Sequence, residues 1–140
     1  FIAPTLVDAP PPDSPLMQEE IFGPILPVLT FDDPDAVADF VNAGEKPLAF
    51  YYFGRKSDGM RLIARTSSGG ACINDTVVHI ANPSLPFGGT GASGMGRYHG
   101  RYSFDTFSNL RGTVVSRRRA DLTLRYPPYD RSFGILKKVL

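Results

Sequence analysis

Short apolar runs recur along the first half of the chain, separated by segments in which apolar residues have helical spacing. The runs at residues 25–31 and 48–53 are typical of buried strands, and residues 70–74 form a third short run of this kind. The opening residues 1–7 have the pattern of an edge strand and begin with Phe1, which leads us to expect a C-terminal piece of a longer protein. The first half is therefore expected to contain short strands.

Two amphipathic segments lie between these predicted strands. Residues 32–35 supply an N-cap, a proline in the first turn and negative charge at a helix start, and residues 42–44 end that helix. Residues 57–66 predict a second helix, which presents Met60, Leu62 and Ile63 as its apolar residues. Strands that alternate with helices predict parallel strands joined by crossover helices, so the expected class is α/β.

The second half of the chain has a different character. Residues 82–100 are rich in glycine and proline and lack a sustained apolar period, which predicts a long loop with a functional role. We expect a helix from about Tyr98 to Phe107 and an outlying strand over residues 110–115. The stretch at residues 125–129 is expected to be an extended tail that lies across a partner.

Charge is distributed unevenly along the 140 residues, although the formal net charge is only +1. Residues 1–60 carry ten acidic and three basic side chains, whereas residues 61–140 carry four and twelve. The basic residues are scattered except at residues 117–119, which favours a solvated face or a salt-bridge surface between subunits over nucleic-acid binding. No apolar run approaches the roughly 18 residues that span a bilayer. We therefore expect neither nucleic acid nor a membrane as a partner.

The sequence contains one cysteine and two histidines. A single cysteine excludes an internal disulfide framework and a multi-thiolate zinc site, and it favours a reducing, cytoplasmic location. Cys72 lies in a short apolar strand with no histidine, lysine or arginine beside it, which predicts an inert core residue rather than a nucleophile. His79 and His99 have no acidic or thiol partner at ligand spacing, so no metal site is expected, and either imidazole could face a pocket.

A carboxylate and an aromatic ring lie close together at residues 19–24, beside a Gly-Pro turn. The two oxygens of the Glu20 carboxylate could chelate the paired hydroxyls of a ribose, and the Phe22 ring could cover a flat heterocycle such as nicotinamide. Taken alone, the same residues also fit a solvated glutamate pair beside a core phenylalanine.

Residues 89–94 match the Gly-x-Gly-x-x-Gly spacing of dinucleotide-binding loops. The strand before this spacing, the helix after it and the acidic residue about twenty positions further on are missing. The context therefore favours a tight active-site wall or a domain-junction loop over phosphate binding.

Several motifs follow one another in a defined order. They are Glu-Glu-Ile-Phe-Gly-Pro at residues 19–24, the strand end at residues 68–75, Leu-Pro-Phe-Gly-Gly at residues 85–89, and Ser-Gly-Met-Gly-Arg-Tyr-His-Gly at residues 93–100. Over nearly its whole length the chain resembles the C-terminal part of an NAD(P)-dependent aldehyde dehydrogenase. The ending at residues 98–108 and the tail at residues 125–128 resemble the class 3 branch, which includes fatty, aromatic and bacterial coniferyl aldehyde dehydrogenases.

This resemblance implies roles for individual residues. Glu20 would bind the nicotinamide ribose hydroxyls of NAD or NADP, and Phe22 would pack near the nicotinamide. The aldehyde funnel would be lined by Val77, Ile80, Ala81 and Phe87, with His99 close to it. Residues 1–109 would be the C-terminal part of the catalytic domain, and residues 110–140 would form the oligomerisation strand and C-terminal tail of a homodimer.

In the family, a cysteine thiolate attacks the aldehyde, hydride passes to nicotinamide, and a glutamate activates water against the thioester. The resemblance places the nucleophile, the general base and the cofactor domain upstream of Phe1, so Glu20 is not the base and the chain alone should be inactive. Its expected partners are those upstream segments of the same polypeptide, an aromatic or medium- to long-chain aldehyde, and a second copy. The alternative is a non-enzymatic dimerisation or binding module derived from such an enzyme.

Overall fold

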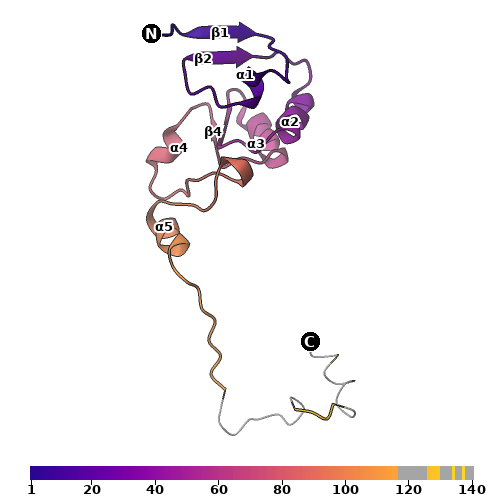
Figure 1. The fold of residues 1–140 in the computed structure, drawn as a ribbon, viewed down its shortest axis with the longest axis vertical. Helices are drawn as coiled ribbons and strands as arrows, with labels where there is room; N and C mark the ends of the chain where they lie inside the picture. The colour runs from indigo at the N-terminus through magenta and orange to yellow at the C-terminus, as the bar shows by residue number, and fades with distance from the viewer. Residues whose placement is uncertain (117–125, 130–133, 135–136, 138–140) are drawn as a thin grey trace. The chain divides into compact units, whose positions relative to one another are not determined.

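The computed structural model of the chain describes residues 1–116, 126–129, 134 and 137. Contacts divide the chain into two units, residues 1–108 and residues 109–140. The helices and strands whose bounds are given below all lie in the first unit, which runs from indigo to orange in Figure 1.

Two pairs of parallel strands form the sheets of the first unit. β1 (Thr5–Asp8) pairs with β2 (Ile25–Val28), and β3 (Ala49–Tyr52) pairs with β4 (Gly70–Ile73). A helix lies in the connection within each pair, because a parallel neighbour can be reached only by a crossover. The predicted α/β class, with parallel strands and crossover helices, is confirmed.

The two longest helices begin close to their predicted positions. α2 (Pro34–Ala43) begins after Asp33, whose side chain accepts a hydrogen bond of 2.9 Å from the Asp35 amide. α3 (Lys56–Arg65) lies in the connection between β3 and β4. The cap and proline signals at residues 33–34 thus produce the helix start that the sequence predicts.

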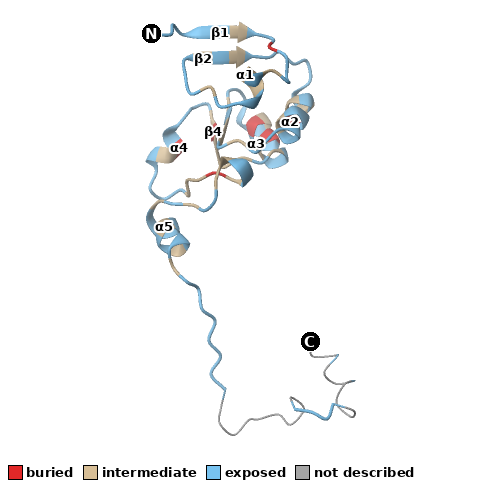
Figure 2. Cartoon of the chain, in the orientation of Figure 1, coloured by how far each residue is buried: buried red, intermediate tan, exposed pale blue. Residues whose placement is uncertain are grey.

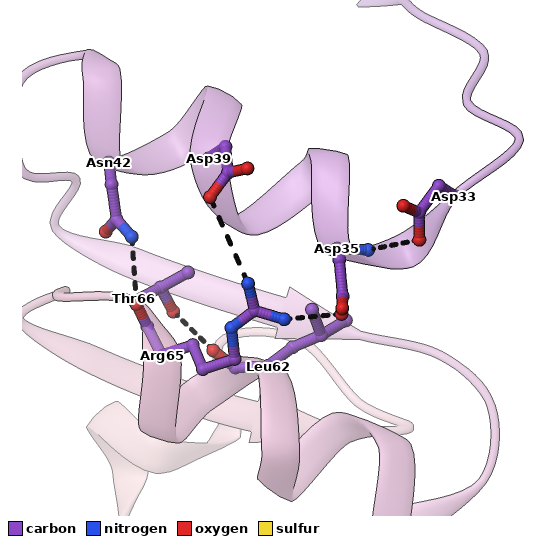
Figure 3. A network of polar contacts seen from close by, with 7 residues as sticks. All are labelled: Asp33, Asp35, Asp39, Asn42, Leu62, Arg65 and Thr66. Atoms are coloured by element: carbon purple, nitrogen blue, oxygen red, sulfur yellow. Dashed lines mark hydrogen bonds and ion pairs between the residues drawn. The ribbon is translucent and has the colours of Figure 1, made fainter.

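Polar contacts join α2 to α3 (Figure 3). The Arg65 guanidinium forms an ion pair with Asp35 and lies 4.0 Å from the Asp39 carboxylate. Asn42 Nδ2 donates a hydrogen bond of 2.9 Å to the Arg65 carbonyl oxygen. These charged side chains are 40% to 82% exposed, so the ion pairs contribute little to stability.

Few side chains of the described residues are buried (Figure 2). The buried hydrophobic ones are Ala38, Leu62 and Cys72. Large apolar side chains such as Phe31 and Phe53 remain mostly exposed. Monomeric soluble proteins rarely leave this much apolar surface in water, so the unit has a surface suited to packing against further protein.

Two short helices were not predicted from the sequence. α1 (Pro15–Gln18) and α4 (Val78–Ala81) have four residues each. A single turn leaves no apolar periodicity to detect, and isolated turns of this length form only with tertiary support. α4 begins shortly after the third predicted strand and is part of the candidate site.

The long loop contains more structure than predicted. A turn of 3₁₀-helix, η1 (Gly91–Ser93), lies inside it, and an isolated bridge pairs Phe87 with Tyr98. The predicted helix from Tyr98 to Phe107 is observed as α5 (Gly100–Thr106) and begins two residues late, because the bridge holds Tyr98 in an extended conformation.

α5 also carries an exposed pair on one face. The Arg101 Nε donates a hydrogen bond of 2.8 Å to the Asp105 carboxylate, and this bond together with the negative charge raises the pKa of Arg101. An arginine is charged at every ordinary pH, so this shift changes no protonation state.

The second unit is described only in part. Residues 109–116 form neither a helix nor a strand, so the predicted strand over residues 110–115 is absent from the single chain. A strand needs a hydrogen-bonded neighbour, and the described residues of one chain offer none here. The basic triplet at residues 117–119 lies outside the described residues, as does residue 125 of the expected tail, and residues 126–129 form neither a helix nor a strand.

Candidate functional site

Glu20 and Phe22 lie in the short connection between α1 and β2. The Glu19 amide donates a hydrogen bond of 2.9 Å to the Pro15 carbonyl and ends α1, and Phe22 has a φ of +45°. The Phe22 ring is 93% exposed, and the Glu20 carboxylate is exposed with no hydrogen bond or ion pair to any described residue. A positive φ is costly for a phenylalanine, so this connection holds the ring outward against a local preference.

A second group of predicted site residues follows the carboxyl ends of β3 and β4. Parallel strands place these ends on one edge of the sheet, where ligands of α/β proteins bind. Beyond β4, Asn74 has a φ of +59° and Val77 a φ of +64°. A left-handed conformation is a true outlier for a β-branched residue such as Val77, and strain of this kind concentrates at functional sites.

The predicted funnel residues Val77, Ile80 and Ala81 lie in α4 or at the residue just before it. Val77 is the N-cap residue and has a left-handed conformation, so helical spacing applies only to Ile80 and Ala81. Val77 is 56% exposed and Ala81 is also exposed, Ile80 is half-buried, and His79 is buried. Val77 and Ala81, which the resemblance assigns to the aldehyde, are therefore accessible on the surface of this segment, whereas His79 packs inward.

Aromatic rings connect α4 to the long loop. Ring centroids lie 5.7 Å apart for His79 and Phe87, and 6.1 Å apart for Phe87 and His99. The backbone bridge between Phe87 and Tyr98 consists of two hydrogen bonds of 3.0 and 2.9 Å. The structure thus brings Phe87 and His99 together and places Phe87 next to α4.

The cofactor residues and the funnel residues form two separate groups within residues 1–116. No side-chain hydrogen bond or ring contact joins Glu20 or Phe22 to Phe87 or His99 in this part of the chain. Two open hollows of about 560 and 470 Å³ border α2, and neither includes a predicted site residue. Neither of these two hollows therefore joins the cofactor residues to the funnel residues.

The environment of Cys72 corrects an expectation from the sequence. Cys72 Sγ lies 3.2 Å from His79 Nδ1, so the thiol does have a histidine partner. The left-handed residues Asn74 and Val77 turn the chain back, which brings α4 against β4. The two residues are seven positions apart in the sequence, and no local sequence pattern indicates that they are in contact.

His79 thus has a thiol partner in space, although the spacing of the two residues along the sequence does not indicate it. Within the described residues, no group of three or more histidine, cysteine, aspartate or glutamate side chains is close enough to hold a metal ion. Both Cys72 and His79 are about 8% exposed, so this pair lies in the interior of the unit.

The glycine-rich loop at residues 88–96 is folded tightly on itself. A Cβ atom on Gly89 would lie 1.9 Å from the Ser93 carbonyl oxygen, so only glycine fits at that position. The Thr90 amide donates a hydrogen bond of 2.9 Å to Ser93 Oγ, and Thr90 directly precedes the short η1. The amide of Thr90 is thus used inside the loop, and this packing suits a wall better than a phosphate cradle.

The roles of Asn74 and His79 are not predicted from the sequence, where His79 is only a histidine that could face a pocket. An asparagine directly after a strand is a known turn former, so the signal for Asn74 was present at residues 73–75. His79 had no signal, because its burial follows from the path of the chain.

No helix among the described residues is long and apolar enough to cross a membrane.

Comparison with known proteins identifies relatives along most of the chain. The sequence profile described as "Aldehyde dehydrogenase family" matches residues 1–113. The 4,4'-diaponeurosporen-aldehyde dehydrogenase of Staphylococcus aureus (strain NCTC 8325 / PS 47) is 49% identical over 138 residues, which are 98% of this chain and 30% of that protein. Aldehyde dehydrogenase family 3 member B1 of Rattus norvegicus is 52% identical over 132 residues, or 92% of this chain and 28% of that protein.

Solved structures agree with these sequence matches. A structure titled "Substrate bound state of Staphylococcus Aureus AldH" superposes with a TM-score of 0.78 at 48% identity, covering 99% of this chain and 31% of that one. An indole-3-acetaldehyde dehydrogenase solved with NAD+ gives a TM-score of 0.72 at 30% identity, covering 81% and 23%. The chain spans about 30% of the length of the first curated relative it matches. This chain belongs to the aldehyde dehydrogenase family.

Proposed function

We propose that this chain is one part of an enzyme that oxidises aldehydes to carboxylic acids with NAD or NADP. The observation that carries the proposal is the family match over residues 1–113, together with relatives of about 50% identity that are named as aldehyde dehydrogenases. Because the chain spans only about 30% of the first such relative, the complete enzyme includes segments beyond these 140 residues. We propose that those segments of the same polypeptide pack against this chain.

The exposed pair of Glu20 and Phe22 suits a nicotinamide nucleoside. The Glu20 carboxylate has no partner among the described residues and keeps its acceptor oxygens available for the two ribose hydroxyls. The Phe22 ring is almost fully exposed beside it and can cover a flat heterocycle. When bound, NAD(P)+ would supply the acceptor for the hydride that leaves the aldehyde.

The exposed face of α4 suits a hydrophobic aldehyde. Val77, Ile80 and Ala81 offer only apolar groups, and Phe87 and His99 extend this surface through the ring contacts. An apolar wall binds a hydrophobic tail and keeps water from the reacting group. An aromatic or medium- to long-chain aldehyde, coniferyl aldehyde among the candidates, is therefore the proposed substrate class.

The nucleophile of the reaction is proposed to come from outside these 140 residues. Cys72 is the only cysteine of the chain, and its thiol is buried against His79, where a substrate carbonyl could not reach it. Glu20 is assigned to the ribose and not to water activation. By this proposal, residues 110–140 contribute to a homodimer.

The direct test is a comparison of the complete polypeptide with the 140-residue chain. Nicotinamide reduction is followed at saturating NAD or NADP with a series of aromatic and aliphatic aldehydes. The proposal expects turnover by the complete polypeptide and none by the chain alone. A complete polypeptide without activity on any aldehyde, or a 140-residue chain with activity, would contradict it.

A further inference from the structure

We propose that His79 is a positioning residue that anchors α4 and so holds the apolar face of that helix toward the aldehyde. The inference rests on the proposed function and adds a specificity role for a residue outside the predicted funnel. It implies that His79 acts on substrate binding through Val77, Ile80 and Ala81 without touching the substrate.

α4 needs an anchor because it cannot hold its own position. It has four residues, and a helix of one turn is unstable in water without packing. Its N-cap residue is Val77, which has left-handed dihedrals and makes no side-chain capping hydrogen bond. Tertiary contacts must therefore offset both the missing cap and the backbone strain.

His79 provides these contacts. Its Nδ1 lies 3.2 Å from Cys72 Sγ of β4, and its ring centroid lies 5.9 Å from that of Tyr51 on β3 and 5.7 Å from that of Phe87. The ring also lies directly over Gly70, where an added Cβ would be 2.7 Å from His79 Cδ2. One side chain thus connects α4 to both strands and to the long loop.

Helix geometry links this anchor to the funnel face. Successive residues of an α-helix are separated by about 100°, so within α4 His79 lies roughly opposite the mean direction of Ile80 and Ala81. The exposures follow this geometry, since His79 is 8% exposed, Ile80 is half-buried and Ala81 is exposed. Burying the imidazole therefore fixes the rotation of α4 that turns the apolar face outward.

The thiol is the polar partner on which the buried ring depends. His79 Nε2 is buried and has no hydrogen-bond partner among the described residues, so Nδ1 makes the polar contact of the imidazole in this part of the chain. Removing the Cys72 thiol would leave both ring nitrogens unpaired, which is unfavourable in the interior. Cys72 thereby belongs to the anchor and not to the chemistry.

Variants of the complete enzyme test the anchor. His79→Phe keeps an aromatic ring and removes the hydrogen bond, and Cys72→Ala removes the thiol from the other side. Loss of one hydrogen bond of about 1 kcal/mol corresponds to roughly a fivefold rise in the KM for a hydrophobic aldehyde. The KM for NAD(P) should be unchanged and kcat should stay within a few-fold, and Cys72→Ser, which restores a donor, should recover most of the aldehyde KM.

Val78→Ala is the matched control, because Val78 lies on the same helix and belongs to neither the anchor nor the funnel face. An unchanged aldehyde KM in His79→Phe would overturn the proposal. A decrease in kcat together with an increase in both KM values and a lower melting temperature would indicate a merely structural residue. That result would also overturn the proposal.

Failure of the proposed function can be told apart from failure of this inference. If the complete polypeptide oxidises no aldehyde, the proposed function fails, and hydrogen exchange at the amides of Val78 and Ile80 still reports the anchor, because both amides donate to nearby carbonyls at 2.6 and 2.9 Å. Faster exchange of these amides in His79→Phe than in Val78→Ala supports the anchor. Equal exchange in the two variants overturns it.

Discussion

Asn74 and Gly54 exchange two hydrogen bonds across the carboxyl ends of β3 and β4. The Gly54 amide donates a hydrogen bond of 2.7 Å to Asn74 Oδ1, and Asn74 Nδ2 donates one of 3.0 Å to the Gly54 carbonyl oxygen. One side chain thereby substitutes for a further rung of the parallel ladder. The turn that begins at Asn74 leads directly into Val77 and α4, so this clamp of two hydrogen bonds lies at the start of the segment that carries the candidate funnel residues.

Replacing Asn74 should lower the stability of the complete enzyme. Asn74→Gly removes both hydrogen bonds but tolerates the positive φ, and we expect a loss of about 1–2 kcal/mol in the free energy of unfolding. Asn74→Ala should cost about 1 kcal/mol more, because alanine is strained in a left-handed conformation. Denaturant unfolding measures both variants, and equal stabilities of Asn74→Gly and wild type would contradict the clamp.

Glu20→Gln should slow hydride transfer in the complete enzyme. The charged hydrogen bonds to the ribose hydroxyls become neutral ones, and a loss of about 1.5 kcal/mol corresponds to roughly a tenfold decrease in rate. Single-turnover nicotinamide reduction measures the step. Glu19→Gln is the matched control, because Glu19 is an adjacent exposed carboxylate whose structural role uses only its backbone amide. Unchanged kinetics in Glu20→Gln would remove the assigned role.

Cys72→Ala should leave kcat of the complete enzyme within a few-fold of wild type. The thiol is buried beside His79 and contributes to the position of α4, so its removal affects aldehyde KM more than turnover. Steady-state kinetics at saturating aldehyde separates the two parameters. A decrease in kcat of about a thousandfold, the size expected on removing a covalent nucleophile, would show that the assignment is wrong.

The 140-residue chain on its own should associate in solution. Large apolar side chains that include Phe31, Phe53 and Phe104 are well over half exposed in the first unit. Hydrophobic surface and open strand edges of this extent favour contact between copies. Sedimentation velocity and the fluorescence of a hydrophobic dye test this, with the complete polypeptide as the control. A monodisperse monomer that binds no dye would contradict the expectation.

Much of the fold could be predicted from local signals. Asp33 and Pro34 determine the start of α2 through a side-chain cap and a fixed φ, and the apolar run at residues 48–53 contains β3. The alternation of strand and helix identifies the parallel pairing without any contact information. The order of motifs also identified the aldehyde dehydrogenase resemblance, because several weak signals in sequence combine into a specific one.

The same signals could not predict α4 or its partners. A single turn has no detectable period, and the left-handed conformation of Val77 opposes the local preference of a β-branched residue. The strand predicted over residues 110–115 is absent from the single chain for a related reason, since pairing requires a neighbour that the local pattern does not encode.

The sequence by itself determined the class of fold and the positions of the long helices, because caps and periodicity act over a few neighbouring residues, and it determined the family through the order of its motifs. Only the tertiary structure decided that His79 lies against Cys72, that Asn74 joins two strand ends, and that Val77 and Ala81 are exposed. The physical reason is that these contacts depend on the path of the backbone through strained residues, and burial supplies the energy that overrides local preference there.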